Sequence, residues 1–74
     1  MKRYTIKARR NSGNDWFPQY TETSVVNGVV VIGNNPQNPS GTLFKTEDEA
    51  NEETLKILKE QNVSMENIQV VKNK

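Results

Sequence analysis

The sequence predicts a small α+β domain, in which an antiparallel sheet in β-β-β-α-β order carries one amphipathic helix packed on one face. Three patterns lead to this fold class. Apolar and polar residues alternate over residues 2–10, as in a half-buried strand. An Asn-Gly pair lies between two runs of valine, and a helical pattern follows a helix-capping signal. The chain has 74 residues, so we expect one domain over residues 1–74.

The first strand is expected over residues 2–10, where Tyr4, Ile6 and Ala8 form the apolar face. The intervening side chains are polar or charged and are expected to point away from the core. Turn-forming residues at 11–15 then predict a hairpin loop, because their short side chains bond to the nearby backbone and tolerate positive φ.

A second strand is expected at 16–24, since this segment is rich in aromatic and β-branched residues. Pro18 has no backbone donor, so the strand lies at a sheet edge or contains a bulge there. Asn27 and Gly28 predict a two-residue type I′ turn, in which both residues need positive φ, and a third strand follows at 29–32. A single bent strand with a bulge at the Asn-Gly pair is the alternative.

Residues 33–41 contain no apolar side chain and two Asn-Pro turn signals, so we expect a mobile loop. Leu43 and Phe44 are expected to return to the core just before the helix. Thr46 is the predicted helix N-cap, and Glu49 completes a capping box three positions later.

The predicted helix has a core-facing stripe at helical spacing, formed by Ala50, Thr54, Ile57, Leu58 and Gln61. Asn62 is expected to end the helix in the left-handed conformation, and Val63 to fold back after it. A last strand is expected at 68–71, pairing beside or among the earlier strands. Residues 72–74 are expected to fray.

Composition favours self-association. The hydrophobic fraction is 32%, the mean hydropathy is -0.85, and the chain has neither cysteine nor histidine, so disulfides and the usual zinc ligands are absent. So small a core rarely gives more than ~3–5 kcal/mol of stability by itself. The run at 29–32 is typical of a strand covered on both faces, whereas one helix covers only one. We therefore expect a homodimer.

Catalytic and cofactor chemistry is not expected. A nucleophilic triad commonly needs a histidine base, and the chain has none. Five carboxylates cluster on the predicted, solvated helix, and helix capping and the helix dipole account for three of them; the five are Glu47, Asp48, Glu49, Glu52 and Glu53. No EF-hand spacing or phosphate-binding glycine loop is found. We therefore predict no enzyme, no cofactor, no metal site and no small-molecule substrate.

One basic and aromatic cluster is a candidate binding surface. Its members lie on the first strand and on the strand that follows it, and are Arg3, Lys7, Arg9, Arg10, Trp16 and Tyr20. Basic strands with interleaved aromatic residues are a platform for single-stranded nucleic acid. An acidic protein partner or a merely solvated strand face would use the same residues. Strict alternation also points only one of Trp16 and Phe17 inward, which leaves the other for a binding surface.

We therefore expect a non-catalytic protein-interaction module, a homodimeric accessory or regulatory protein that binds through its sheet face. The alternative is binding of single-stranded RNA or DNA through the basic and aromatic first hairpin. A second alternative is a small inhibitor protein from a phage or mobile element. No secretory leader and no stretch of about 18 apolar residues is found, so we expect a cytoplasmic protein without a membrane partner.

Overall fold

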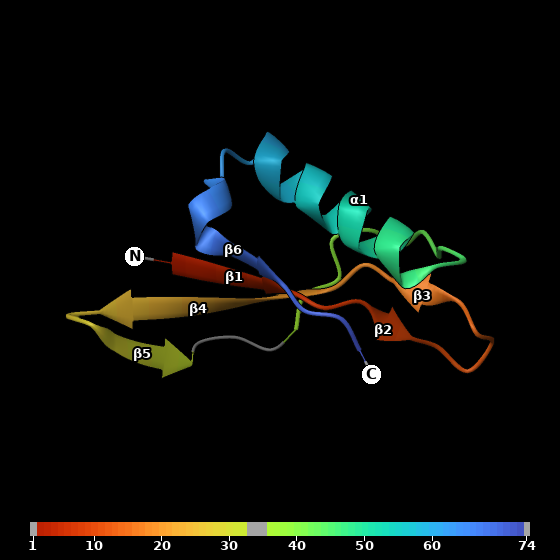
Figure 1. The fold of residues 1–74 in the computed structure, drawn as a ribbon, viewed down its shortest axis with the longest axis horizontal. Coiled ribbons are helices and arrows are strands. Elements are labelled where there is room, and N and C mark those ends of the chain that lie inside the picture. Colours follow the sequence, from red (N-terminus) through yellow and green to blue (C-terminus); the bar gives the residue numbers. More distant parts are fainter. Residues whose placement is uncertain (1, 33–35, 74) are drawn as a thin grey trace.

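The computed structural model describes residues 2–32 and 36–73, and it confirms the predicted α+β fold (Figure 1). The elements, in chain order, are β1 (Lys2–Ile6), β2 (Arg9–Arg10), β3 (Trp16–Phe17), β4 (Tyr20–Val26), β5 (Val29–Ile32), α1 (Glu47–Glu60), the 3-10 turn η1 (Met65–Asn67) and β6 (Ile68–Val70). In Figure 1, α1 lies above one face of the sheet, and the β4–β5 hairpin extends away from it.

The main sheet has the strand order β5-β4-β1-β6. β4 pairs antiparallel with β1 and with β5, as expected for hairpin-connected strands. β6 pairs parallel with β1, so the sheet is mixed and not wholly antiparallel. The physical reason is the helix, because α1 carries the chain back to the end of the sheet where β1 begins (Figure 1).

The two long N-terminal strands are each interrupted. The first breaks at residues 7–8 and the second at Pro18, where an edge or bulge was predicted. Beyond these breaks, β2 and β3 form a separate two-stranded ribbon. The backbone N–H of Ala8, at the first break, donates to the Oδ1 of Asn51 on α1 at 3.1 Å. A helix side chain thus replaces the strand partner that this amide has lost.

The predicted β4–β5 hairpin turn is confirmed. Asn27 has φ 52° and Gly28 has φ 79°, which is the double positive-φ geometry of a type I′ turn. Val26 and Val29 pair across it, so the bulged alternative is wrong. The 11–15 loop is also formed as predicted.

Both predicted helix ends are confirmed. The Oγ1 of Thr46 accepts from the backbone N–H of Glu49 at 3.2 Å and donates to its carboxylate at 3.0 Å. Asn62 has φ 64°, and the N–H of Val63 donates to the carbonyl of Leu58 at 3.1 Å. This is a Schellman ending, which satisfies carbonyls that would otherwise lack partners.

The core lies between α1 and the strands. Its buried members are Ile6, Ala8, Pro18, Ala50, Asn51, Thr54 and Leu58. Leu43 was expected in the core but is 43% exposed. Phe44 pairs with Trp16 through two backbone hydrogen bonds, so the side chain of Phe44 points inward and that of the preceding Leu43 points outward. Gln61 was also expected there, yet it is the exposed C-cap residue.

Two of the C-terminal residues that are expected to fray make contacts with α1 and with residue 8. The side-chain amide of Asn73 donates to the carbonyl of Ala8 at 2.6 Å and to the Oε2 of Glu47 at 2.8 Å. Lys72 and Asp48 form an ion pair at 2.8 Å. Lys74 lies outside the described residues.

Of the loop predicted at residues 33–41 to be mobile, residues 33–35 lie outside the described residues, and residues 36–41 are described. Gln37, in its second half, is held against β4. Its backbone N–H and carbonyl both bond to Tyr20, at 2.7 and 3.0 Å.

Candidate functional site

The strand register divides the main sheet into two faces, because residues paired across neighbouring strands project to the same side. The helix face carries Tyr4, Ile6, Tyr20, Glu22 and Ile68. The open face carries Arg3, Thr5, Thr21, Thr23, Val25 and Gln69. Ile6 is fully buried under α1, whereas the open-face residues are exposed or half-buried. The sheet therefore presents one largely polar surface that α1 does not cover.

Three of the predicted basic residues share the open face. Arg3 pairs with Thr23 there, and Lys7 and Arg9 keep the alternation, because the intervening Ala8 is 1% exposed and faces α1. All three cations are exposed. Between residues 2 and 73, apart from 33–35, the ion pairs are Lys2–Glu22 and Lys72–Asp48, so none of the three is neutralised by a carboxylate.

Most acidic side chains lie away from the open face. The chain has nine acidic residues, and none occupies an open-face position in the described strands. Glu22 pairs opposite Tyr4 on the helix face, where it accepts from the Tyr4 hydroxyl at 3.2 Å and contacts Lys2 at 3.3 Å. The others lie in the 11–15 loop, on α1 or on η1. Charge is thus segregated across the sheet although the net charge is only +1.

The other predicted site residues do not join this surface. Tyr20 pairs with Ile6 on the helix face, and its ring lies 6.1 Å from that of Tyr4 at 51°. Trp16 is half-buried and pairs with Arg10, on the side of buried Ala8 and Pro18.

Arg10 is held locally, because its guanidinium donates to the Oδ1 of Asn14 in the 11–15 loop. The predicted cluster of six is therefore divided between two faces. Its open-face members are Arg3, Lys7 and Arg9.

Phe17, and not Trp16, is the member of this adjacent aromatic pair that lies beside an open-face cation. It pairs with Arg9 across the β2–β3 ribbon and is half-buried. The signal was present in the loop length, because a loop at 11–15 pairs residue 10 with residue 16 and residue 9 with residue 17. Threonine at positions 21 and 23 was a further signal of a polar strand face.

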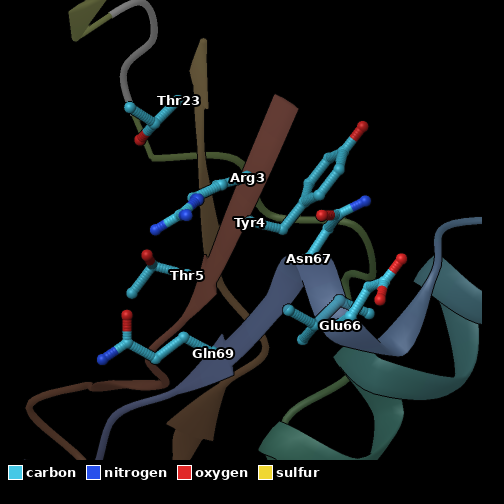
Figure 2. A pocket seen from close by; sticks show the side chains of 8 residues that line it. Arg3, Tyr4, Thr5, Thr23, Glu66, Asn67 and Gln69 are labelled. Carbon is cyan, nitrogen blue, oxygen red and sulfur yellow. The ribbon is translucent and has the colours of Figure 1, made fainter. Parts of the chain in front are cut away.

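A hollow of about 430 Å³ lies at the edge of the sheet beside η1, next to the Arg3 end of the open face, and we call it the notch. It is lined by Arg3, Tyr4, Thr5, Thr23, Glu66, Asn67, Ile68 and Gln69. Figure 2 shows Arg3, Thr5, Thr23 and Gln69 on one side of β1, and Tyr4, Glu66 and Asn67 on the other. The notch exists because β6 begins opposite Tyr4, so β1 extends beyond its neighbour where the chain turns through η1.

Tyr4 lines the notch as a neutral group. Partial burial raises the pKa of its hydroxyl above the ordinary value of 10.0, and the hydrogen bond to Glu22 and the negative charge of that carboxylate raise it further. The hydroxyl therefore remains protonated at neutral pH. The notch combines this phenol with a guanidinium, two amides, two hydroxyls and a carboxylate.

Two further features concern the described part of the chain. No three His, Cys, Asp or Glu side chains among these residues gather closely enough to hold a metal ion. α1, with 14 residues, falls short of the length and apolar character that a bilayer-spanning helix needs, and no other described helix meets them.

Comparison with protein-family models, with curated proteins and with solved structures found no match.

Proposed function

We propose that this chain is a non-catalytic binding module that holds an anionic partner against the open face of its sheet. The segregation of charge carries the proposal. Arg3, Lys7 and Arg9 lie on this face without an ion-pair partner among the described residues, and the face has no carboxylate in its strands.

A net charge of +1 does not prevent such binding, because the local electrostatic potential at the open face, and not the net charge of the protein, determines whether an anion binds there. Stacked layers of secondary structure lie about 10 Å apart. This distance is comparable with the Debye length of ~8 Å at physiological ionic strength, so the carboxylates of α1 offset the open-face potential only in part. An anion that approaches the open face therefore meets mainly positive charge.

The test is retention on a heparin column, a sequence-independent polyanion probe, for two variants of equal charge. One replaces Arg3, Lys7 and Arg9 by alanine, and the other replaces the exposed cations Lys45, Lys56 and Lys59. We expect wild type and the second variant to elute at similar salt, and the first variant to elute much earlier. Equal elution of the two variants, or no retention of wild type at low salt, would contradict the proposal.

A second candidate function is self-association, as the composition suggested, but at another surface. Open faces of two copies would oppose like charges, which is unfavourable. Val26 and Val29, by contrast, are 56% and 64% exposed and pair with each other beside the β4–β5 turn. The rest of the valine run, residues 30–32, has no described side chain. We propose that a second copy covers this exposed pair.

Molecular mass in solution, measured at two protein concentrations and two salt levels, tests this candidate. We expect a concentration-dependent dimer that persists at high salt, because its contact is apolar. The double variant Val26→Thr/Val29→Thr keeps β-branched side chains and should be monomeric. A wild-type monomer at every concentration would exclude the homodimer and leave the open-face proposal intact.

A further inference from the structure

We propose that the anionic partner is a single-stranded nucleic acid, which runs along β1 from the notch beside Arg3 to the Arg9–Phe17 pair on the β2–β3 ribbon. This inference rests on the proposed function, since it names the partner of the same open face. Three features support it: the polarity of the face, an aromatic ring beside a cation, and the hollow at the opposite end.

The chemistry of the face suits a nucleic acid better than a protein. Along β1, β6 and the facing part of β4 it presents a guanidinium, three hydroxyls and an amide, from Arg3, Thr5, Thr21, Thr23 and Gln69. Among the side chains that the structure describes, the exposed large hydrophobic residues lie elsewhere, and are Val26, Val29, Leu43, Met65 and Val70. Protein interfaces are built around a buried apolar centre. Nucleic-acid interfaces are polar and strongly positive, as this stretch is.

Phe17 and Arg9 form the stacking end of the path. Residues directly opposite each other on antiparallel strands have Cβ atoms about 4.5–5.5 Å apart, and Phe17 is paired with Arg9 in this way. A base stacked on the ring of Phe17 would bring its own phosphate within reach of the guanidinium. Sheet-borne aromatic residues beside cations bind unpaired bases by this combination.

A single strand fits the shape of the site, whereas a duplex does not. Reading a duplex requires an α-helix or a β-ribbon that enters the groove. The projecting β4–β5 ribbon ends in exposed Val26 and Val29, which have no charge to meet phosphates. The first turn of α1 is acidic, with Glu47, Asp48 and Glu49. A flat sheet face remains, and only unpaired bases can lie against it.

The notch forms the other end of the path. Its volume of about 430 Å³ lies within the ~300–1,000 Å³ range of small-ligand pockets. Asn67 and Gln69 offer amide donors and acceptors, and Glu66 offers an acceptor only. A carboxylate repels phosphate but accepts from an exocyclic amine such as that of cytosine. We therefore place a base in the notch, with its phosphate toward Arg3 on the open face.

The experiment is fluorescence anisotropy with wild-type protein and four labelled probes: mixed-sequence single-stranded RNA, single-stranded DNA, the DNA duplex and a poly-glutamate peptide. The single strands should bind more tightly than the duplex and the peptide. Contact with three phosphates predicts a log–log salt slope near −2, at about −0.7 per phosphate. The Arg3→Ala/Lys7→Ala/Arg9→Ala variant should lose both the affinity and this slope.

Phe17→Leu keeps an apolar side chain but removes the ring, and Phe44→Leu does the same at a half-buried site away from the open face. Thermal unfolding establishes that both variants fold. We expect Phe17→Leu to weaken single-strand binding roughly 5- to 150-fold, as for loss of one stacked base, and Phe44→Leu to leave it unchanged. An equal effect of the two substitutions would overturn the stacking path.

The remaining outcomes separate this inference from the proposed function. Binding of poly-glutamate without binding of oligonucleotides would overturn the nucleic-acid inference and leave an anion-binding module. Equal binding of duplex and single strand would overturn the preference for unpaired bases. If no probe binds at low salt and heparin is not retained, the proposed function fails as well.

Discussion

The Oδ1 of Asn51 accepts a hydrogen bond from the backbone N–H of Ala8, 43 positions earlier in the chain, at 3.1 Å. The bond lies where β1 ends and the β2–β3 ribbon begins, between two of the open-face cations. Asn51 is 5% exposed and Ala8 is 1% exposed, so water does not replace the contact. A buried side chain of α1 thus fixes the backbone that presents Lys7 and Arg9 on the opposite face.

Asn51→Ala should destabilise the domain by about 1–3 kcal/mol, because the buried amide of Ala8 loses its acceptor. Among the described residues the buried Nδ2 of Asn51 has no hydrogen-bond partner, so its removal breaks no further hydrogen bond and places the effect in the lower half of that range. The free energy of unfolding in urea measures the change. The neighbouring exposed Glu52 gives the control, since Glu52→Ala should change stability by less than about 0.5 kcal/mol. Equal effects of the two would mean that the Asn51 contact contributes nothing.

Local signals were sufficient for the parts of the fold that depend on neighbouring residues. The Asn27-Gly28 turn, the Thr46 cap and the Asn62 helix end are each decided within a few positions, and all three are confirmed. The parallel pairing of β6 was not foreseen, because strand direction depends on the path of the whole chain. The same holds for the contact of Asn73 with Ala8, which joins residues 65 positions apart.

The candidate site was predicted in part for the same reason. Alternation along one strand was enough to place Arg3, Lys7 and Arg9 on one face. The aromatic partner required the register between strands, which places Tyr20 on the helix face and Phe17 beside Arg9. Periodicity alone therefore identified the cations but not the ring that lies beside one of them.

Gly28→Ala tests the turn that ends the β4–β5 hairpin. A Cβ at Gly28 would meet no atom of the described residues within 4 Å, so we attribute its cost to the left-handed backbone with φ +79°. We expect a loss of about 1–2 kcal/mol. Gly41 is the matched control, because its added Cβ also meets nothing within 4 Å and its backbone is not left-handed. Gly41→Ala should be neutral or stabilise by up to about 1 kcal/mol, and thermal unfolding of both variants checks the difference.

Tyr4 should contribute to stability in a pH-dependent way. Burial, the hydrogen bond to Glu22 and the charge of Glu22 raise the pKa of Tyr4 in the folded state above its ordinary value of 10.0. The folded state therefore favours the neutral phenol. Its contribution is complete below about pH 10 and is lost as the pH rises through the folded-state pKa.

Comparison of wild type with Tyr4→Phe from pH 8 to 12 measures this contribution. The substitution should cost about 1 kcal/mol at pH 8, the value of one hydrogen bond. The difference between the two unfolding free energies should then shrink above pH 10. A difference that stays constant to pH 12 would show that the Tyr4–Glu22 contact does not favour the neutral phenol.

Thr23→Glu tests whether a change of charge on the open face weakens binding while the stability of the fold is kept. Thr23 lies directly opposite Arg3, so the new carboxylate forms a cross-strand ion pair with it. Such a pair contributes about 0.2–1 kcal/mol, and stability should be kept or slightly increased. Polyanion binding should nevertheless fall, because the substitution neutralises a cation on the binding face without removing any cationic side chain.

The adjacent Ser24 supplies the control: it lies opposite Lys2 on the helix face, so Ser24→Glu makes the same charge change on the other side of the sheet. Heparin elution and oligonucleotide anisotropy should respond to Thr23→Glu and not to Ser24→Glu. If both substitutions weaken binding equally, net charge and not the open face determines it.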